Sequence, residues 1–274
     1  MSDELNEHLL ANPDKLACLF GRIAFRAGQA IMKVRHTAAG NPYIKSDGSP
    51  VTAADLASDE IIRHALAEDL PGVPVVTEES CVTAPSKDAE RFILVDPLDG
   101  TREFIKGSDE FTVNIALIER GTPVAGAVYA PALRRLYVGG ATAHRLDVAS
   151  ADAEPKFDGM KPIRVRRPPP EGWHVAVSRS HLDPDTQHWI DRHRIAELRP
   201  AGSSLKFCAV AEGEADVYPR LGATMEWDTA AGHAVLLAAG GRVTDPDGRP
   251  ITYGKPDYRN GNFIAWGSID QTTR

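Results

Sequence analysis

The feature that most constrains this chain is a short apolar run that leads directly into an acidic turn. Residues 91–95 read Arg-Phe-Ile-Leu-Val, as a buried strand does, and Asp96-Pro-Leu-Asp99-Gly-Thr101 follows without a spacer. Pro97 fixes one φ angle and Gly100 permits a tight turn, so the two carboxylates can converge. We therefore expect an acidic loop at the carboxyl end of a strand, where the sites of α/β proteins commonly lie.

The remaining apolar pattern predicts helices and strands along the whole chain. Apolar residues recur at helical spacing over 15–35, and a second helix is expected from Thr52 to Leu70, where Pro71 and Gly72 end it. Clustered strands in the first half and strand–helix alternation in the second predict an α/β (α+β) fold. Strands are expected at 73–77, 91–95, 111–118, 124–130, 135–138, 173–178, 216–218, 242–244 and 262–266, and helices at 184–195, 203–213 and 228–240.

The length of the chain, 274 residues, corresponds to roughly 1.8 domains of ~150 residues. The clearest internal boundary is the stretch from about 150 to 172, which is rich in Ala, Asp, Lys and Pro. We therefore divide the chain into residues 1–150, an α+β subdomain, and residues 151–274, an α/β subdomain.

Composition excludes several classes of protein. Lys and Arg number 31 against 38 Asp and Glu, a net charge of −7, which argues against a general nucleic-acid binder. The three cysteines lie far apart and form no CxxC pair, which argues against a disulfide scaffold or zinc ribbon. No apolar stretch approaches the ~18 residues of a transmembrane segment, and the acidic N-terminus does not resemble a signal peptide. We expect a cytoplasmic protein, monomer or homodimer; a peripheral position at the inner membrane stays open.

Further acidic residues lie where predicted strands end or helices begin. Glu78 and Glu79 follow the strand at 73–77, Asp55 lies near a helix start, and Asp228 opens the helix after Trp227. Taken singly, each has a structural explanation: a helix cap for Asp55 and Asp228, a solvated turn for the two glutamates. Together with Asp96 and Asp99, they supply the hard oxygen ligands that suit Mg²⁺ or Mn²⁺.

Read in order, these blocks resemble the inositol monophosphatase-like, lithium-sensitive, Mg²⁺-dependent phosphatases. Four blocks carry the resemblance: Asp55, Glu78-Glu79, Asp96-Pro-Leu-Asp99-Gly-Thr101 and Trp227-Asp-Thr-Ala-Ala-Gly232. Four further blocks, 111–117, 178–181, 202–208 and 218–220, together with 227–233, which extends the last block by one residue, are similar to the branch of CysQ-type 3′(2′),5′-bisphosphate nucleotidases. The resemblance implies a layered α/β/α/β/α sandwich with the site in a cleft between the subdomains. It also implies removal of the 3′-phosphate of adenosine 3′,5′-bisphosphate (PAP), a by-product of sulfur assimilation, to give AMP.

The resemblance assigns roles to residues of this chain. It implies two or three Mg²⁺ ions bound by Glu78, Asp96, the Leu98 carbonyl, Asp99 and Asp228. Glu79 either supports these ligands or binds a weaker metal. Asp55 and Thr101 match the pair that activates the attacking water. Substrate contacts are expected from Gly100, Thr101, His181, Ser203, Ser204, Lys206, Arg220 and Asp228.

Other readings of the same residues remain. An inositol monophosphate or fructose bisphosphate phosphatase would share the acidic core, and only the blocks between 178 and 220 favour a nucleotide. A haloacid dehalogenase-type phosphatase needs aspartates two apart, whereas Asp96 and Asp99 are three apart. A non-catalytic sensor on this fold should have lost some of the ligands that are present here.

Overall fold

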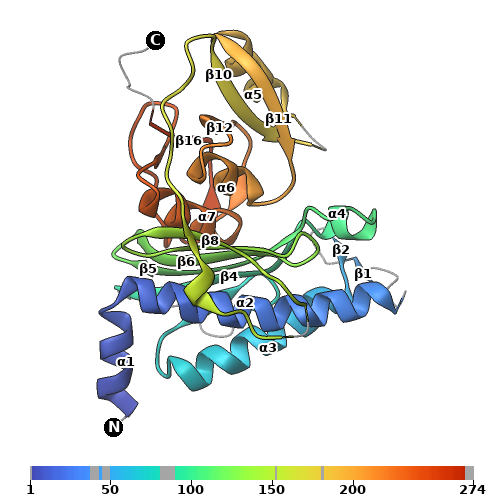
Figure 1. The fold of residues 1–274 in the computed structure, drawn as a ribbon, viewed down its shortest axis with the longest axis vertical. Helices are drawn as coiled ribbons and strands as arrows, with labels where there is room; N and C mark the ends of the chain where they lie inside the picture. The colour runs from blue at the N-terminus through green and yellow to red at the C-terminus, as the bar shows by residue number, and fades with distance from the viewer. Residues whose placement is uncertain are drawn as a thin grey trace.

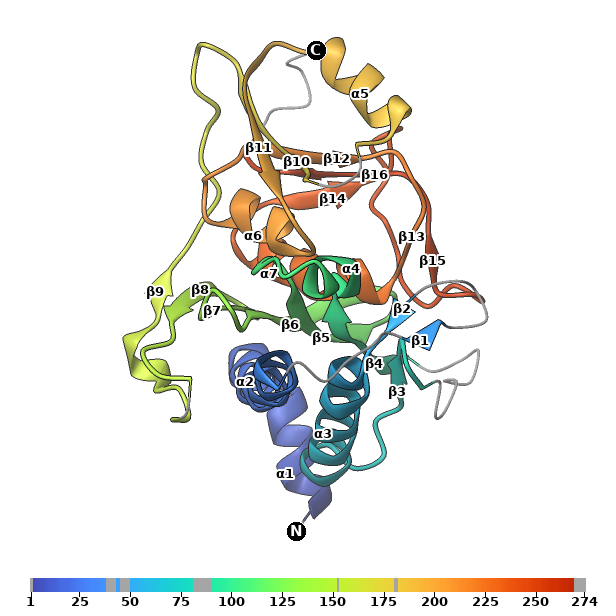
Figure 2. The ribbon, with the colours of Figure 1, turned by 90° about the vertical axis from the view of Figure 1, so that its right-hand side faces the viewer.

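A computed structural model describes residues 2–37, 43–44, 50–80, 90–151, 153–179 and 182–268. His181, an expected substrate contact, lies outside the described residues. Figures 1 and 2 show helices and sheets stacked in the order helix, sheet, helix, sheet, helix. The predicted α/β/α/β/α layering is therefore confirmed.

The large sheet has seven strands in the order β3-β4-β5-β6-β7-β8-β9, and helices cover its outer face (Figure 2). Its strands are β3 (Val75–Thr77), β4 (Arg91–Asp99), β5 (Thr112–Glu119), β6 (Thr122–Ala130), β7 (Arg135–Gly139), β8 (Ala143–Asp147) and β9 (Lys161–Pro162). The covering helices are α2 (Pro13–His36) and α3 (Ala53–Asp69), and α1 (Ser2–Leu10) packs against α2. Helix α2 buries Phe20, Ile23 and Ile31, spaced to form one face, in the same core as Ile115 and Leu117 of β5.

The small sheet has five strands in the order β11-β10-β12-β16-β14. They are β10 (Trp173–Ser178), β11 (Ile195–Ala201), β12 (Val217–Arg220), β14 (Arg242–Thr244) and β16 (Phe263–Trp266). Helices α4 (Thr101–Ile105), α6 (Leu205–Ala211) and α7 (Trp227–Ala238) lie between the sheets, and α5 (Pro184–Asp191) lies beyond the small one (Figure 2). Two short pairs, β1 (Tyr43–Ile44) with β2 (Pro50–Val51) and β13 (Thr224–Met225) with β15 (Arg259–Asn260), and the 3₁₀ turn η1 (Phe157–Gly159) complete the described elements.

Helix α7 lies close against the large sheet because glycines face it. A Cβ built on Gly139 would lie 2.5 Å from Val235 Cα, and one on Gly126 would lie 2.8 Å from Ala234 Cβ. Any larger side chain at these two positions of β6 and β7 would push α7 outward. The N-terminus of α7 carries Asp228, so this close packing sets the height of that carboxylate above the sheet.

Most predicted elements are confirmed, and the differences have local causes. The helix expected at 184–195 ends at Asp191. Residues 195–201 form the edge strand β11, whose exposed and partly buried positions do not alternate regularly, so the sequence shows no strand pattern there. Helices α1 and α4 and strands β8 and β9 were not predicted. The division of the chain near residue 150 stays a prediction; the last strand of the large sheet ends at Pro162.

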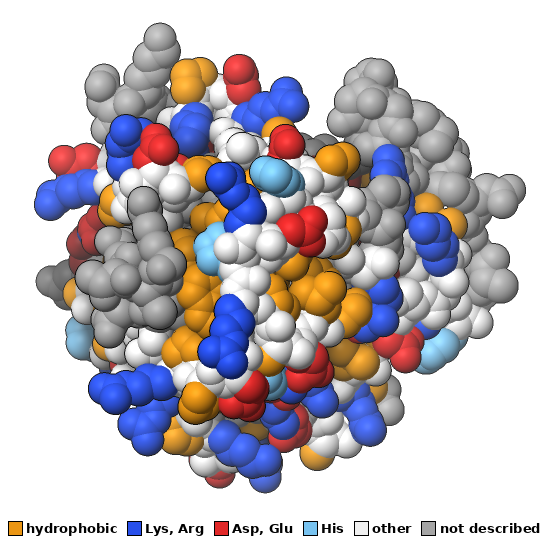
Figure 3. Space-filling model, turned by 90° about the horizontal axis from the view of Figure 1, so that it is seen from above, with side chains coloured by type: hydrophobic (Ala, Val, Ile, Leu, Met, Phe, Trp, Pro, Cys, Tyr) orange, Lys and Arg blue, Asp and Glu red, His pale blue; other side chains and the backbone are white. Residues whose placement is uncertain are grey.

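Within the described residues, no helix is long and apolar enough to cross a membrane. Figure 3 shows the face nearest the small sheet, where blue Lys and Arg side chains are interspersed with red Asp and Glu. The side chains coloured in this view therefore do not gather into one large basic patch.

Candidate functional site

The acidic segment belongs to β4 rather than to a loop after it, which corrects the expectation. Asp96 pairs with Asn114 and Asp99 with Thr112 of β5, and the register shifts between the two aspartates. Asp96 Oδ1 accepts a hydrogen bond of 3.0 Å from Leu98 N, which bends the chain back at Pro97. Gly100 follows with φ +94°, and a Cβ there would lie 2.5 Å from Ser203 Oγ, so this turn requires glycine.

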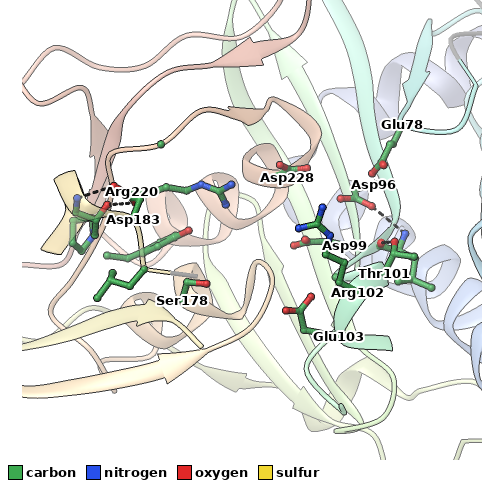
Figure 4. Close-up of a pocket in the computed structure, with 17 residues that line it drawn as sticks. Glu78, Asp96, Asp99, Thr101, Arg102, Glu103, Ser178, Asp183, Arg220 and Asp228 are labelled. Atoms are coloured by element: carbon green, nitrogen blue, oxygen red, sulfur yellow. Dashed lines mark hydrogen bonds between the residues drawn. The ribbon is translucent and has the colours of Figure 1, made fainter. Parts of the chain in front are cut away.

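Three carboxylates converge beside this turn. One carboxylate oxygen from each of Glu78, Asp96 and Asp228 lies within 4.8 Å of the other two. They come from the end of β3, from β4 and from the first turn of α7, and Figure 4 shows them facing one another. Only the tertiary fold brings these three segments together.

The electrostatics of the cluster fit a divalent cation. Burial, with the charges of Glu78, Asp99 and Asp228, raises the pKa of Asp96 well above its usual range. Anionic oxygens held this close repel one another unless a cation lies between them, and hard oxygen donors suit Mg²⁺ or Mn²⁺. The residues present therefore fit the metal that the sequence implied.

Asp99 lies in the same pocket, with one oxygen already engaged. Asp99 Oδ2 accepts hydrogen bonds from Ser204 N at 2.7 Å and from Asn114 Nδ2 at 3.4 Å. Burial and the charge of Asp228 raise its pKa to about 7, against the opposing charges of Lys206 and Arg220. Its Oδ1 has no hydrogen-bonding partner in the described part of the chain, so Asp99 can still offer one oxygen to the pocket.

Asp55 and Thr101 form a direct pair. Thr101 Oγ donates to Asp55 Oδ1 at 2.8 Å and lies 3.2 Å from the Leu98 carbonyl oxygen. Asp55 Oδ2 accepts from Thr52 N at 2.7 Å and from Thr52 Oγ at 2.6 Å, completing a capping box at the start of α3. One carboxylate thus caps the helix with one oxygen and holds Thr101 with the other.

Ser203 and Ser204, which precede α6, use their hydroxyls in hydrogen bonds within the protein. Ser203 Oγ donates to the carbonyls of Asp99 and Glu110 at 2.9 and 3.0 Å, with the backbone at φ +50°. Ser204 Oγ donates to Asn114 at 2.7 Å, and neither side chain caps α6. The expected helix N-terminus is present, but the two hydroxyls fasten α6 to β4 and β5.

The two expected cations are placed differently. Lys206 is buried, and its Nζ donates to the Ser203 carbonyl at 2.7 Å, whereas a solvated lysine would have been the ordinary expectation. Arg220, at the end of β12, extends its guanidinium toward Asp228 across the pocket (Figure 4). Among the expected substrate residues that the structure describes, Arg220 is the cation best placed to meet an anion in the pocket.

A cavity of about 460 Å³ opens between these groups. Its lining includes Glu78, Asp96, Asp99, Thr101 and Asp228 on one side and Ser178, Leu182, Asp183, Tyr218 and Arg220 on the other. A smaller cavity of about 140 Å³ shares Asp99, Gly100 and Arg220 and reaches Lys206. The cavity thus has lining residues from the large sheet and from the small one, while the site's position in a cleft between subdomains 1–150 and 151–274 stays a prediction. Glu79 lines neither of these two cavities.

Sequence reasoning missed three residues that hold the site. Asn114 links Asp99 to Ser204, and Thr224 Oγ donates a hydrogen bond to Asp228 Oδ2. Glu110 receives Arg179 through two hydrogen bonds of 2.7 Å and also accepts from Gly202 N at 2.9 Å. Asn114 interrupts an otherwise apolar strand, which is a signal in the sequence. Glu110 ends a polar stretch and Thr224 lies between Ala223 and Met225, and neither position stands out.

In the metal-free protein, we expect ionisation of Asp99 to destabilise the fold as pH rises from about 4 to 7. Its folded pKa is about 7, whereas an unfolded aspartate titrates near ~3.9. Between these values the native state binds more protons, so the destabilisation is absent below pH ~4 and complete above pH ~7. Urea unfolding in EDTA across this range, compared between wild type and Asp99→Asn, measures it. A difference between the two proteins that stays constant with pH would contradict the assignment.

The sequence profile of the inositol monophosphatase family matches residues 12–273 of this chain. The 3′(2′),5′-bisphosphate nucleotidase CysQ of Salmonella typhimurium is 45% identical over 237 residues, covering 85% of this chain and 91% of that protein. The crystal structure of CysQ from Bacteroides thetaiotaomicron, described as a bacterial member of the inositol monophosphatase family, has a TM-score of 0.80. It is 35% identical and covers 94% of this chain and 98% of that one.

An inositol monophosphatase from Anabaena (Nostoc) also shares the fold, with a TM-score of 0.71. It is 26% identical and covers 93% of this chain and 91% of its own. None of these names supports the peripheral membrane position that the sequence left open.

Proposed function

This chain belongs to the inositol monophosphatase family, and on that premise we propose that it is a Mg²⁺-dependent 3′(2′),5′-bisphosphate nucleotidase. It hydrolyses the 3′-phosphate of PAP and releases AMP and inorganic phosphate. The observation that carries the proposal is the 45% identity to a nucleotidase over most of the chain, against 26% to an inositol monophosphatase.

The acidic cluster gives this reaction its electrostatic basis. A phosphomonoester brings about two negative charges into a pocket whose lining already includes six carboxylates, so cations are needed. Glu78, Asp96, Asp99 and Asp228, with the Leu98 carbonyl, are the groups that would hold Mg²⁺. Bound Mg²⁺ supplies charge neutralisation at the phosphoryl oxygens and acidifies water. Glu79 would support Glu78 from the same turn.

Asp55 and Thr101 would manage the proton of the attacking water. Because the Thr101 hydroxyl donates to Asp55, its oxygen lone pair is left to accept a hydrogen bond from water in the pocket. Asp55 then orients this water through Thr101 and favours loss of its proton. The water oxygen attacks phosphorus in line while its proton passes through the Thr101 hydroxyl to Asp55. The bond to the ribose 3′-oxygen breaks, that oxygen takes up a proton from solvent, and Asp55 returns its proton to solvent.

The remaining anionic group of the substrate needs a separate cation. Arg220 extends into the cavity (Figure 4), and Lys206, bonded to the Ser203 carbonyl, adds positive charge at the smaller cavity that adjoins it. Gly100 and Thr101 line the larger cavity, and their backbone would contact the phosphoryl group. We also propose that the first ~150 residues carry the metal groups and the later part carries the nucleotide pocket, apart from Asp228.

Parallel assays of phosphate release test this function. With Mg²⁺ present, we expect PAP to be hydrolysed to AMP far faster than inositol 1-phosphate or fructose 1,6-bisphosphate, and EDTA to abolish the activity. A preference for an inositol or fructose phosphate would keep the metal chemistry and overturn the nucleotide assignment. No hydrolysis of any of the three would overturn the proposal altogether.

A further inference from the structure

Helix α3 carries a buried polar face next to the site. Asp55, Ser58 and Asp59 lie three and four residues apart and therefore on one side of the helix, and their exposures are 1%, 0% and 4%. Polar groups buried on a helix are costly unless they make hydrogen bonds. Asp55 bonds to Thr101, as described above, while the proposed function gives Ser58 and Asp59 no role.

Ser58 contacts the segment that carries two of the metal-binding aspartates. Its hydroxyl donates to the Pro97 carbonyl oxygen at 2.7 Å, in an environment that excludes water. Pro97 lies directly between Asp96 and Leu98, at the register shift of β4. The Ser58 hydroxyl therefore holds this irregular turn at its centre, where the strand ladder does not.

Asp59 contacts the turn that carries Glu78. Asp59 Oδ2 accepts from Ser80 Oγ at 3.0 Å and from Arg63 Nε at 2.8 Å. Ser80 closes that turn against Thr77, because Ser80 N donates to Thr77 Oγ at 2.8 Å and the two hydroxyls are 3.0 Å apart. Glu78 and Glu79 are the two residues enclosed between Thr77 and Ser80.

The bonding of Asp59 is one-sided. Its Oδ1 is buried and has no hydrogen-bonding partner among the residues that the structure describes. Burial of a carboxylate with one oxygen unsatisfied is expensive, and the ion pair with the half-exposed Arg63 on the same helix offsets only part of that cost. The contact from Ser80 is the one that ties Asp59 to a different segment, the Glu78 turn.

We propose that Ser58 and Asp59 are positioning residues for metal binding, so that α3 is the common support of both metal-bearing segments. This inference rests on the metal role of Glu78 and Asp96 in the proposed function. In the metal-free protein, repulsion drives Glu78 away from Asp96, and two tethers to the same rigid helix oppose that movement. The two tethers thereby hold the carboxylates in position before the cation binds, so that the cation does not have to assemble the site.

Binding of Mn²⁺ alone, followed by electron paramagnetic resonance without substrate, tests the proposal. Ser80→Ala removes the tether to Asp59 and is expected to raise the Mn²⁺ dissociation constant about tenfold, as loss of outer partners of metal ligands does. Ser80→Thr keeps the hydroxyl and should stay within about twofold of wild type. Ser58→Ala should weaken binding about as much as Ser80→Ala. Glu60→Gln, an exposed change on the opposite face of α3, is the matched control.

Kinetics at rising Mg²⁺ give the second readout. The concentration of Mg²⁺ for half-maximal rate should rise in Ser80→Ala and Ser58→Ala, while kcat at saturating Mg²⁺ recovers to within about threefold of wild type. If the two serines only stabilise the fold, Ser80→Ala and Ser58→Ala would lower the melting temperature without raising the Mg²⁺ concentration for half-maximal rate. Ser80→Thr would then make no difference to that Mg²⁺ concentration.

The outcomes separate this inference from the proposed function. Equal Mn²⁺ affinity in wild type and in the Ser80→Ala and Ser58→Ala variants would overturn the positioning role and leave the function intact. A wild type that binds no Mn²⁺ would overturn the metal assignment and this inference with it. If Ser58→Ala does not fold, the Ser80→Ala and Ser80→Thr pair decides, because Ser80 lies in a partly exposed turn.

Discussion

Replacement of Asp55 by asparagine is expected to lower kcat for PAP by about 10²- to 10⁴-fold, the range of general acid–base catalysis. The amide can keep its oxygen toward Thr52 and the helix cap, but its NH₂ then faces Thr101. The Thr101 hydroxyl must accept that hydrogen bond and donate to the Leu98 carbonyl, 3.2 Å away. Water at Thr101 then loses both its orientation and the carboxylate that draws off its proton. Steady-state assays of AMP formation at saturating Mg²⁺ measure the loss.

Metal binding is expected to survive the Asp55→Asn change. Asp55 is not among the three carboxylates that converge, so the Mn²⁺ dissociation constant should stay within about threefold of wild type. The melting temperature shows whether the helix cap was kept. A variant with near-normal kcat would remove Asp55 from the proposed mechanism.

Replacement of Asp228 by asparagine is expected to reduce kcat/KM by more than ~100-fold. Loss of an outer partner of a metal ligand costs up to about that factor, and Asp228 is itself a proposed metal ligand. The asparagine oxygen can still accept from Thr224 and Met225, so α7 keeps its place. The other terminal atom, now an NH₂, faces Glu78 and Asp96 and repels a cation. Phosphate release from PAP and Mn²⁺ titration measure the two losses.

The melting temperature, measured with and without Mg²⁺, provides the control for Asp228→Asn. Because one charge leaves a buried anionic cluster, the metal-free variant should melt at or above the wild-type temperature, and Mg²⁺ should raise that temperature less than in wild type. Asp245→Asn, in a surface turn beside Arg249, is the matched change and should alter neither quantity. Retained Mg²⁺ stabilisation and activity in Asp228→Asn would show that this carboxylate does not bind the metal.

Local sequence determined most of the elements and the chemical nature of the site. Apolar spacing at 3.6 residues fixed α2, and Thr52 with Asp55 fixed the start of α3. Strand β5 showed little alternation in the sequence because helices cover both faces of its sheet, so apolar residues occupy nearly every position. The order of the acidic blocks was enough to indicate a metal-dependent phosphatase.

Edge strand β11 and the course of β4 through Asp99 could not be read from the sequence, for related reasons. An edge strand is partly exposed and lacks a clean period, and a register shift depends on the partner strand. The same holds for the hydrogen bonds of Ser203 and Ser204, whose partners lie on β4 and β5, and for the burial of Lys206. The residue types at these positions predicted substrate contacts. Tertiary packing decided which of their polar atoms remain available to a substrate.

Short-range spacing and side-chain chemistry therefore account for most of the helices and strands, for the family and for the residue types of the acidic site. Tertiary structure alone decided that Glu78, Asp96 and Asp228 meet within 4.8 Å and that α3 tethers two of their segments. The physical reason is distance along the chain: 132 residues separate Asp96 from Asp228, and only the packing of α7 on the glycines of β6 and β7 sets their approach.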